Sequence, residues 1–289
     1  MLQVERPVFI VAAPRSGSTM LFETLARIPG IWTIGGESHD EFERVPGWHP
    51  RDRGYDSNRL TAADADASAR ARLTTAFALK LRDSEGVPWR GRGPAAAREA
   101  VRLLEKTPKN ALRVPLLKAL FPDARFIFLV RDPRDSLSSI MEAWRSGRFV
   151  TYRDLPAWPG PAWSLLLPPG WRHLSGAPLE RIAAFQWATA NAVALDDLNV
   201  VPADDRCAVS YETLIASPRA ILERLSAFVG IPLSPSVLDA MAKLPVSRHT
   251  LTPPKPGKWR DNATAIEAIL PEVENVWTRL RAALMTGAA

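Results

Sequence analysis

Three stretches of the chain share one pattern: a short apolar run, then a turn, then apolar residues at helical spacing. The first run, residues 7–13 (PVFIVAA), is continuous and rich in β-branched side chains, which is typical of a strand buried on both faces. Runs at 125–130 and 206–210 are similar, and helical patterns follow at 132–144 and 217–229. This alternation predicts an α/β fold in three layers, with helices flanking a central parallel sheet.

The turn after the first run resembles a P-loop, the phosphate-binding pattern G-x-x-x-x-G-K-[ST]. When Gly17 and Thr19 are aligned with its last glycine and hydroxyl residue, Ala12 replaces the first glycine and Ser18 replaces the lysine. The basic residue stands upstream instead, at Arg15. The loop is therefore P-loop-like, but it lacks the lysine that an ATPase or GTPase uses, and it favours a smaller terminal phosphate or sulfate group.

The residues of this loop suit an anion. A helix N-terminus presents free N–H groups, Gly17 lets the backbone approach closely, and Ser16, Ser18 and Thr19 add hydroxyl donors. Arg15 adds a fixed charge with a planar set of donors. The alternative is a helix start capped by Ser16 or Ser18, with Arg15 in solvent.

A second basic residue ends a strand-like run. Arg131 follows 125–130, where a charged side chain is costly unless it is paired or faces a ligand. Ser139 lies two helical turns further on and reaches the same ligand only if the helix runs beside it. The alternative pairs Arg131 with Asp132 or Asp135 and leaves Ser139 on the helix surface.

Taken together, the two segments resemble the sulfotransferases that use 3′-phosphoadenosine 5′-phosphosulfate. The loop Pro14–Thr19 matches that family's Pro-Arg-Ser-Gly-(Ser/Thr)-Thr motif, and Arg131 with Ser139 matches its 3′-phosphate motif. The resemblance implies a metal-free enzyme that releases 3′-phosphoadenosine 5′-phosphate. It implies that the 5′-phosphate and sulfonate contact Arg15, Ser16, Gly17, Ser18 and Thr19, and that the 3′-phosphate contacts Arg131 and Ser139.

Two later segments extend the resemblance. Residues 210–232 resemble the family's Tyr-Glu-(Asp/Thr)-Leu segment, which makes Tyr211 a candidate nucleotide contact. Its alternative is a partly buried tyrosine with a bonded hydroxyl. Residues 247–260 resemble a loop that closes over the nucleotide, although a solvated basic loop is the alternative. The candidates in that loop are Ser247, Arg248 and Lys258.

Sulfuryl transfer to a hydroxyl also needs a base and positive charge near the leaving phosphate. By resemblance Glu37 is the first candidate for the base and His39 the second. Strand alternation puts both on one face, where they can act as a pair. Lys106 resembles a lysine placed near the transferring sulfonate. The alternatives are exposed loop residues for the first two and a helix-end lysine for Lys106.

We expect one domain over residues 1–289, with substrate-side insertions at 43–100 and 146–178. The first contains a helical pattern at 61–83. The second is a proline-rich loop region whose tryptophans can line an acceptor pocket, form core, or do both. These tryptophans are Trp144, Trp158, Trp163 and Trp171.

Composition limits the classes of partner. A net charge of +6 favours an anionic ligand, and 46% hydrophobic residues suffice for a large core. Cys207 is the single cysteine, and neither a metal-ligand spacing nor an apolar run of membrane length occurs. We therefore expect a cytoplasmic enzyme without metal, membrane or nucleic-acid partner, which sulfates a hydroxyl of a small molecule, carbohydrate or natural product. The rival interpretations are a P-loop nucleotide or small-molecule kinase and a basic nucleic-acid-binding domain.

Overall fold

One six-stranded sheet organises the computed structural model, which describes residues 2–90, 100–253, 255 and 257–286. The strand order is β3-β2-β4-β1-β5-β8. Neighbouring strands run parallel, except that β3 pairs antiparallel with β2. The strands are β1 (Val8–Val11), β2 (Ile31–Thr33), β3 (Arg82–Asp83), β4 (Arg102–Lys106), β5 (Arg125–Val130) and β8 (Arg206–Ser210).

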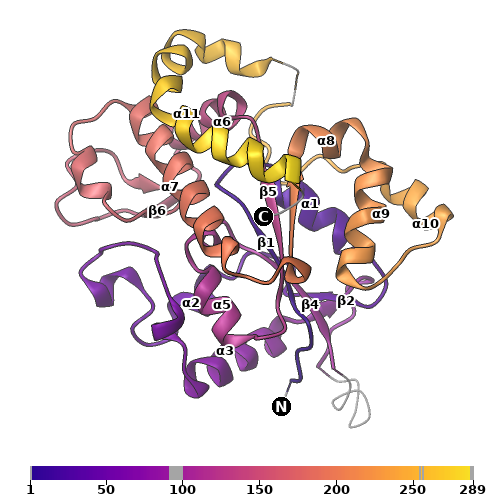
Figure 1. Cartoon of the computed structure of the whole chain (residues 1–289). Coiled ribbons are helices and arrows are strands. Elements are labelled where there is room, and N and C mark those ends of the chain that lie inside the picture. The colour runs from indigo at the N-terminus through magenta and orange to yellow at the C-terminus, as the bar shows by residue number, and fades with distance from the viewer. Residues whose placement is uncertain (1, 91–99, 254, 256, 287–289) are drawn as a thin grey trace.

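Helices cover both faces of the sheet (Figure 1). One face carries α1 (Ser18–Leu25), α9 (Pro218–Val229) and α10 (Pro235–Met241), with α8 (Tyr211–Ala216) beside them. The other face carries α3 (Ala67–Lys80), α5 (Val114–Leu120), α6 (Pro133–Ser146), α7 (Leu179–Asn199) and α11 (Ala263–Thr286). The predicted three-layer α/β fold is confirmed, with one antiparallel strand at the sheet edge.

The alternation of side chains along the strands explains the two cores. Val8 and Ile10 of β1 pack with the α1 and α9 side, whereas Phe9 packs toward the opposite face against Phe126, with ring centroids 5.8 Å apart. Every residue of β1 is buried, because both faces are covered by helices. This explains why the run is apolar throughout.

Strand order determines where a ligand fits. From β1 the chain passes through α1 to β2 on one side, and from β4 it passes through α5 to β5 on the other side. In sheets of this type the crevice lies outside the carboxyl ends of the strands, where such connections diverge. The loop at residues 12–17 follows β1 at this place.

Several expectations need correction. The helix expected over 61–83 is a 3₁₀ turn at Ala62–Asp64, then α3, then β3, because Asp66 starts a new helix by accepting a hydrogen bond from the Ala69 N–H. We did not predict β4. Glu37 does not lie on a strand, since β2 ends at Thr33. Asp132 caps α6 as expected, but Ser217 makes no side-chain cap.

The tryptophans of the second insertion belong to the core. Trp163, on β7 (Trp163–Ser164), is fully buried and contacts the other three rings at centroid distances of 5.2, 4.9 and 5.5 Å. Its strand pairs with β6 (Val150–Tyr152) in a separate two-stranded sheet. The tryptophan cluster therefore stabilises the segments around β6 and β7.

We expect Trp163→Ala to lower the free energy of unfolding by about 3–5 kcal/mol, because it leaves a cavity at the centre of four rings. Trp158, which is half-buried at the edge of the cluster, provides the matched control, and Trp158→Ala should cost clearly less. Urea unfolding of both variants measures the difference. Equal losses would show that the two rings contribute alike.

Candidate functional site

The loop between β1 and α1 is folded tightly against a tyrosine. Gly17 has φ +88°, in the left-handed region, and a Cβ there would lie 2.5 Å from the ring of Tyr211. Arg15 also has a positive φ, +66°. Gly17 is the N-cap residue of α1, which has no side-chain cap, so neither Ser16 nor Ser18 caps it. Ser16 is buried and its Oγ has no protein partner.

Arg15 is held by neutral groups. Its Nε donates to Ser139 Oγ at 3.2 Å, a terminal nitrogen donates to the His249 carbonyl at 3.1 Å, and the guanidinium lies 4.7 Å from the centroid of the Phe149 ring. Burial and the nearby charge of Arg131 lower the pKa of Arg15. Among the described residues Arg15 forms no ion pair, so its charge is available to an anion.

Arg131 approaches the same loop from β5. It donates to the Arg15 carbonyl at 3.1 Å, and its guanidinium lies 4.5 Å from the centroid of the Tyr211 ring. Its contact with Asp135 is long, at 3.9 Å, and its Nε is buried without a partner. Unpaired donors on Arg131 and Ser16 fit a ligand rich in acceptor oxygens.

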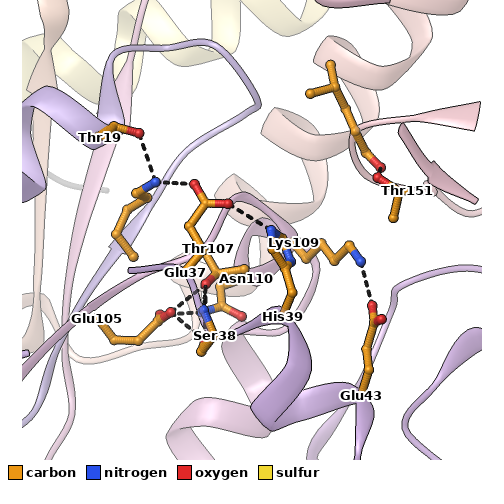
Figure 2. Close-up of polar contacts among 12 residues, drawn as sticks. Thr19, Glu37, Ser38, His39, Glu43, Glu105, Thr107, Lys109, Asn110 and Thr151 are labelled. Atoms are coloured by element: carbon orange, nitrogen blue, oxygen red, sulfur yellow. Dashed lines mark hydrogen bonds and ion pairs between the residues drawn. The ribbon is translucent and has the colours of Figure 1, made fainter. Parts of the chain in front are cut away.

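A chain of polar contacts begins at Thr19 in the first turn of α1 (Figure 2). Lys106, at the end of β4 and nearly inaccessible, donates to Thr19 Oγ1 at 2.9 Å and forms an ion pair with Glu37 Oε1. Glu37 Oε2 in turn lies 2.7 Å from His39 Nε2. Glu37 and His39 thus meet as expected, but by a different route: they flank the turn that leads into α2 (His39–Glu43). The helix-end interpretation of Lys106 is wrong.

A buried carboxylate supports this turn from below. Glu105 is fully buried and accepts hydrogen bonds from Ser38 Oγ at 2.5 Å, Thr107 Oγ1 at 2.6 Å and Asn110 Nδ2 at 2.5 Å. The Ser38 N–H also donates to Thr107 Oγ1, at 2.8 Å. Burial raises the pKa of Glu105. Together these bonds fix the backbone between Glu37 and His39.

The two candidate bases differ in acidity. Burial acts to raise the pKa of Glu37, but hydrogen bonds from His39 and Lys106 and the charge of Lys106 prevail and lower it to about 2. Burial, with the charge of Lys109, lowers the pKa of His39 below its usual 6.5, although the bond to Glu37 opposes this. Near neutral pH a carboxylate therefore faces a neutral imidazole, whose Nδ1 has no partner.

Beyond His39 lies a second pair that the sequence analysis missed. Lys109 Nζ donates to Glu43 Oε1 at 2.5 Å and lies 3.4 Å from the Tyr152 hydroxyl, which accepts from Asn58 Nδ2 at 2.7 Å. Burial and the charge of Arg113 lower the pKa of Lys109 to about 8, against the effect of Glu43. Lys109 stands three residues after Lys106 in "EKTPKN", so recognition of β4 would have pointed to it.

One cavity of about 980 Å³ lies among these groups. Of the residues predicted from the sequence, the following line it: Arg15, Gly17, Ser18, Thr19, Glu37, His39, Arg131, Ser139, Tyr211, Ser247 and Lys258. Ser16, Lys106 and Arg248 do not line it. From the insertions, Glu43 and residues 149–151, 165 and 166 contribute, while residues 91–99 lie outside the described chain.

The late segment that ends at Trp259 covers one side of the cavity. Arg248 is paired with Glu23 at 2.7 Å and Lys258 with Glu142 at 2.7 Å, so both are tied to helices. His249, which we did not predict, lines the cavity and packs edge-on against Phe149 with ring centroids 6.3 Å apart. Pro254 and Pro256 of this segment lie outside the described chain.

Among the described residues, no cluster of three or more His, Cys, Asp or Glu side chains is suited to hold a metal ion. A separate search of the same residues found no helix with the length and apolarity needed to cross a membrane.

Residues 7–235 match a family model described as "Sulfotransferase family". The chain is 24% identical over 237 residues to protein-tyrosine sulfotransferase A of Caenorhabditis elegans, which covers 80% of this chain and 51% of that protein. A putative protein-tyrosine sulfotransferase of Caenorhabditis briggsae is 25% identical over 138 residues, 48% of this chain and 44% of that protein. The chain therefore spans about half the length of these curated relatives.

Solved structures show the same fold. A sulfotransferase of Alicyclobacillus acidocaldarius superposes with a TM-score of 0.53 at 16% identity, covering 98% of this chain and 97% of that one. A sulfotransferase of Mycobacterium avium gives 0.52 at 18% identity, covering 93% and 76%.

The contact between Gly17 and Tyr211 gives a test of the loop. We expect Gly17→Ala to cost about 1–2 kcal/mol for the left-handed backbone, and more because its Cβ meets the Tyr211 ring. Gly30→Ala is the matched control, since Gly30 has φ +86° and nothing within 4 Å of the added Cβ. Chemical denaturation of both variants, and of Gly17→Ala combined with Tyr211→Ala, separates the two costs. If Gly17→Ala and Gly30→Ala cost the same, the ring does not constrain the loop.

Proposed function

The chain belongs to the sulfotransferase family, and on that premise we propose that it transfers a sulfuryl group from 3′-phosphoadenosine 5′-phosphosulfate to an acceptor hydroxyl. The observation that carries the proposal is the pair of guanidinium groups, Arg15 and Arg131, that face one cavity without a close carboxylate partner. A kinase of the P-loop type would require a lysine where Ser18 stands.

The residues present fit such a nucleotide. Ser16 Oγ and Arg131 Nε are buried donors without a protein partner, and the first turn of α1 carries no side-chain cap. We assign the 5′-phosphate and sulfonate to Arg15, Ser18 and Thr19 with the backbone of Ser16 and Gly17, and the 3′-phosphate to Arg131 and Ser139. When bound, the nucleotide supplies the sulfuryl group and a phosphate leaving group.

The later candidates have more limited roles in this proposal. Tyr211 holds Arg131 by its ring face and packs over Gly17, so it shapes the nucleotide site. Ser247 and Lys258 line the cavity, whereas the side chain of Arg248 is engaged by Glu23 and by the Gly35 carbonyl at 3.2 Å. We propose that Arg248 fastens the covering segment rather than contacting the nucleotide.

Proton removal falls to the Glu37–His39 pair. An efficient base has a pKa near the working pH, and that of Glu37, about 2, is far below it. His39 is neutral near pH 7 and can accept a proton; the ionised Glu37 accepts its Nε2–H, orients the ring and stabilises the imidazolium that forms. Lys106 holds Glu37 in place and neutralises its charge, and Arg15 adds positive charge where negative charge develops on the leaving oxygen.

We expect tight calorimetric binding of 3′-phosphoadenosine 5′-phosphate, with clearly weaker binding of 5′-AMP and ATP. Arg131→Ala should weaken the bisphosphate by about 10–100-fold, the loss of one or two charged hydrogen bonds. Arg219→Ala is the control, because Arg219 is exposed, pairs with Asp239 at 2.8 Å and does not line the cavity. Preference for ATP, or equal affinities of the two variants, would contradict the proposal.

The base assignment predicts a pH profile. His39 acts in its neutral form, so kcat/KM should be level at neutral pH and fall on acidification through a pKa below 6.5. Glu37 acting alone would stay ionised and give a flat profile between about pH 5 and 7. Initial rates with any alcohol that the enzyme sulfates provide the measurement, with His39→Gln expected to abolish the acidic limb.

A further inference from the structure

The two ends of the cavity differ in how their charges are compensated. At the donor end, around Arg15 and Arg131, the guanidinium groups contact hydroxyl and carbonyl oxygens, an aromatic ring each, and a carboxylate no closer than 3.9 Å. Such a site gains from a bound anion, because the buried positive charge otherwise remains without a counter-charge.

At the acceptor end, formed by α2, Lys109 and the segments around β6 and β7, the charges are already paired. Glu37 is bound by Lys106 and His39, and Lys109 is bound by Glu43. Asp40 at the rim lies 3.3 Å from Arg44. An ionic group on an acceptor would have to compete with one of these contacts.

The Lys109–Glu43 pair has the least exposed charged side chains that line this end. The Lys109 side chain is 3% exposed and that of Glu43 is 16% exposed, yet both line the cavity. Side by side they offer one N–H donor and one carboxylate acceptor, which suits a hydroxyl or amide that can both accept and donate. Separating a buried pair leaves an uncompensated charge, so a lone carboxylate or ammonium is disfavoured here.

The facing wall is apolar. Phe149, Val150, Leu165 and Leu166 line the cavity, and Thr151 stands across from Lys109 with its hydroxyl already donated to the Leu165 carbonyl at 2.7 Å (Figure 2). This wall therefore offers contact area to a carbon skeleton and few hydrogen bonds.

We propose that this end of the cavity binds an uncharged acceptor: a hydroxylated molecule with an apolar body whose second polar group is hydrogen-bonded by the Lys109–Glu43 pair. This rests on the proposed sulfuryl transfer and specifies its substrate class. One group opposes it, since Arg113 is buried behind the pair with both terminal nitrogens unpartnered. Arg113 does not line the cavity, so Lys109 and Glu43 decide what the acceptor meets.

The test is calorimetric binding to the protein saturated with 3′-phosphoadenosine 5′-phosphate. Two matched series serve as probes: 2-(4-hydroxyphenyl)ethanol, tyramine and 4-hydroxyphenylacetate, and hexane-1,6-diol, 6-aminohexan-1-ol and 6-hydroxyhexanoate. In at least one series the neutral member should bind about 10-fold or more tightly than both charged members, a factor worth 1.4 kcal/mol. The inference is overturned if, in both series, a charged member binds as well as the neutral one. It is also overturned if neither neutral member binds.

Two variants assign the effect to the pair. Glu43→Gln leaves Lys109 without its carboxylate and should shift the ranking by about 10-fold toward the carboxylate probe. Lys109→Met should shift it toward the amine. Lys118→Met is the control, since Lys118 pairs with Asp205 at 2.7 Å away from the cavity and should leave the ranking unchanged.

Nucleotide binding distinguishes failure of the proposed sulfuryl transfer from failure of the acceptor assignment. Undiminished binding of 3′-phosphoadenosine 5′-phosphate by each variant shows that it is folded. Absence of nucleotide binding in the unaltered protein would defeat the proposed function itself. Normal nucleotide binding combined with preference for a charged probe, or variants that do not move the ranking, would defeat only the acceptor assignment.

Discussion

The candidate site depends on the burial of one carboxylate, Glu105, beneath the turn that follows β2. A buried carboxylate must be hydrogen-bonded, and its three donors come from the turn itself and from the segment after β4. Those bonds hold Ser38 in place, and Ser38 separates Glu37 from His39. The distance between Glu37 and His39 in the cavity thus depends on Glu105, which does not line the cavity.

Strand alternation explains how the short strand β4 supports both the turn before α2 and the start of α1. Glu105 shares the face of β4 with Leu103 and points toward the turn, whereas Lys106 points toward α1 and reaches Thr19 and Glu37. β4 lies between β1 and β2 in the sheet, so its end is next to both the anion loop and the turn. The order of the strands, more than any single motif, brings the donor and acceptor halves together.

Much of this was readable in the sequence. β5, α9 and the loop after β1 were predicted because continuous apolar runs and proline-started helices are local signals. The residues proposed to hold the nucleotide were selected because they follow strands that were recognised, and most of them line the cavity. β4 was missed because three of its five residues are charged, and with it were missed Glu105 and Lys109. The meeting of Glu37 and His39 was expected from a strand that is not there; a turn and a buried carboxylate achieve it instead.

The contact between Arg15 and the His249 carbonyl has a consequence for how the molecule is assembled. It joins residues 234 positions apart, and through Arg15 it links the first loop to the covering segment near the end of the fold. Contacts between residues so far apart in the sequence form late, because a long loop must close, at a cost in entropy, before the contact adds any stability. During synthesis, then, the sheet and the loop between β1 and α1 can fold well before the cavity gains its last wall. A ribosome-bound chain that already has its sheet would still lack the segment that covers one side of the proposed nucleotide site.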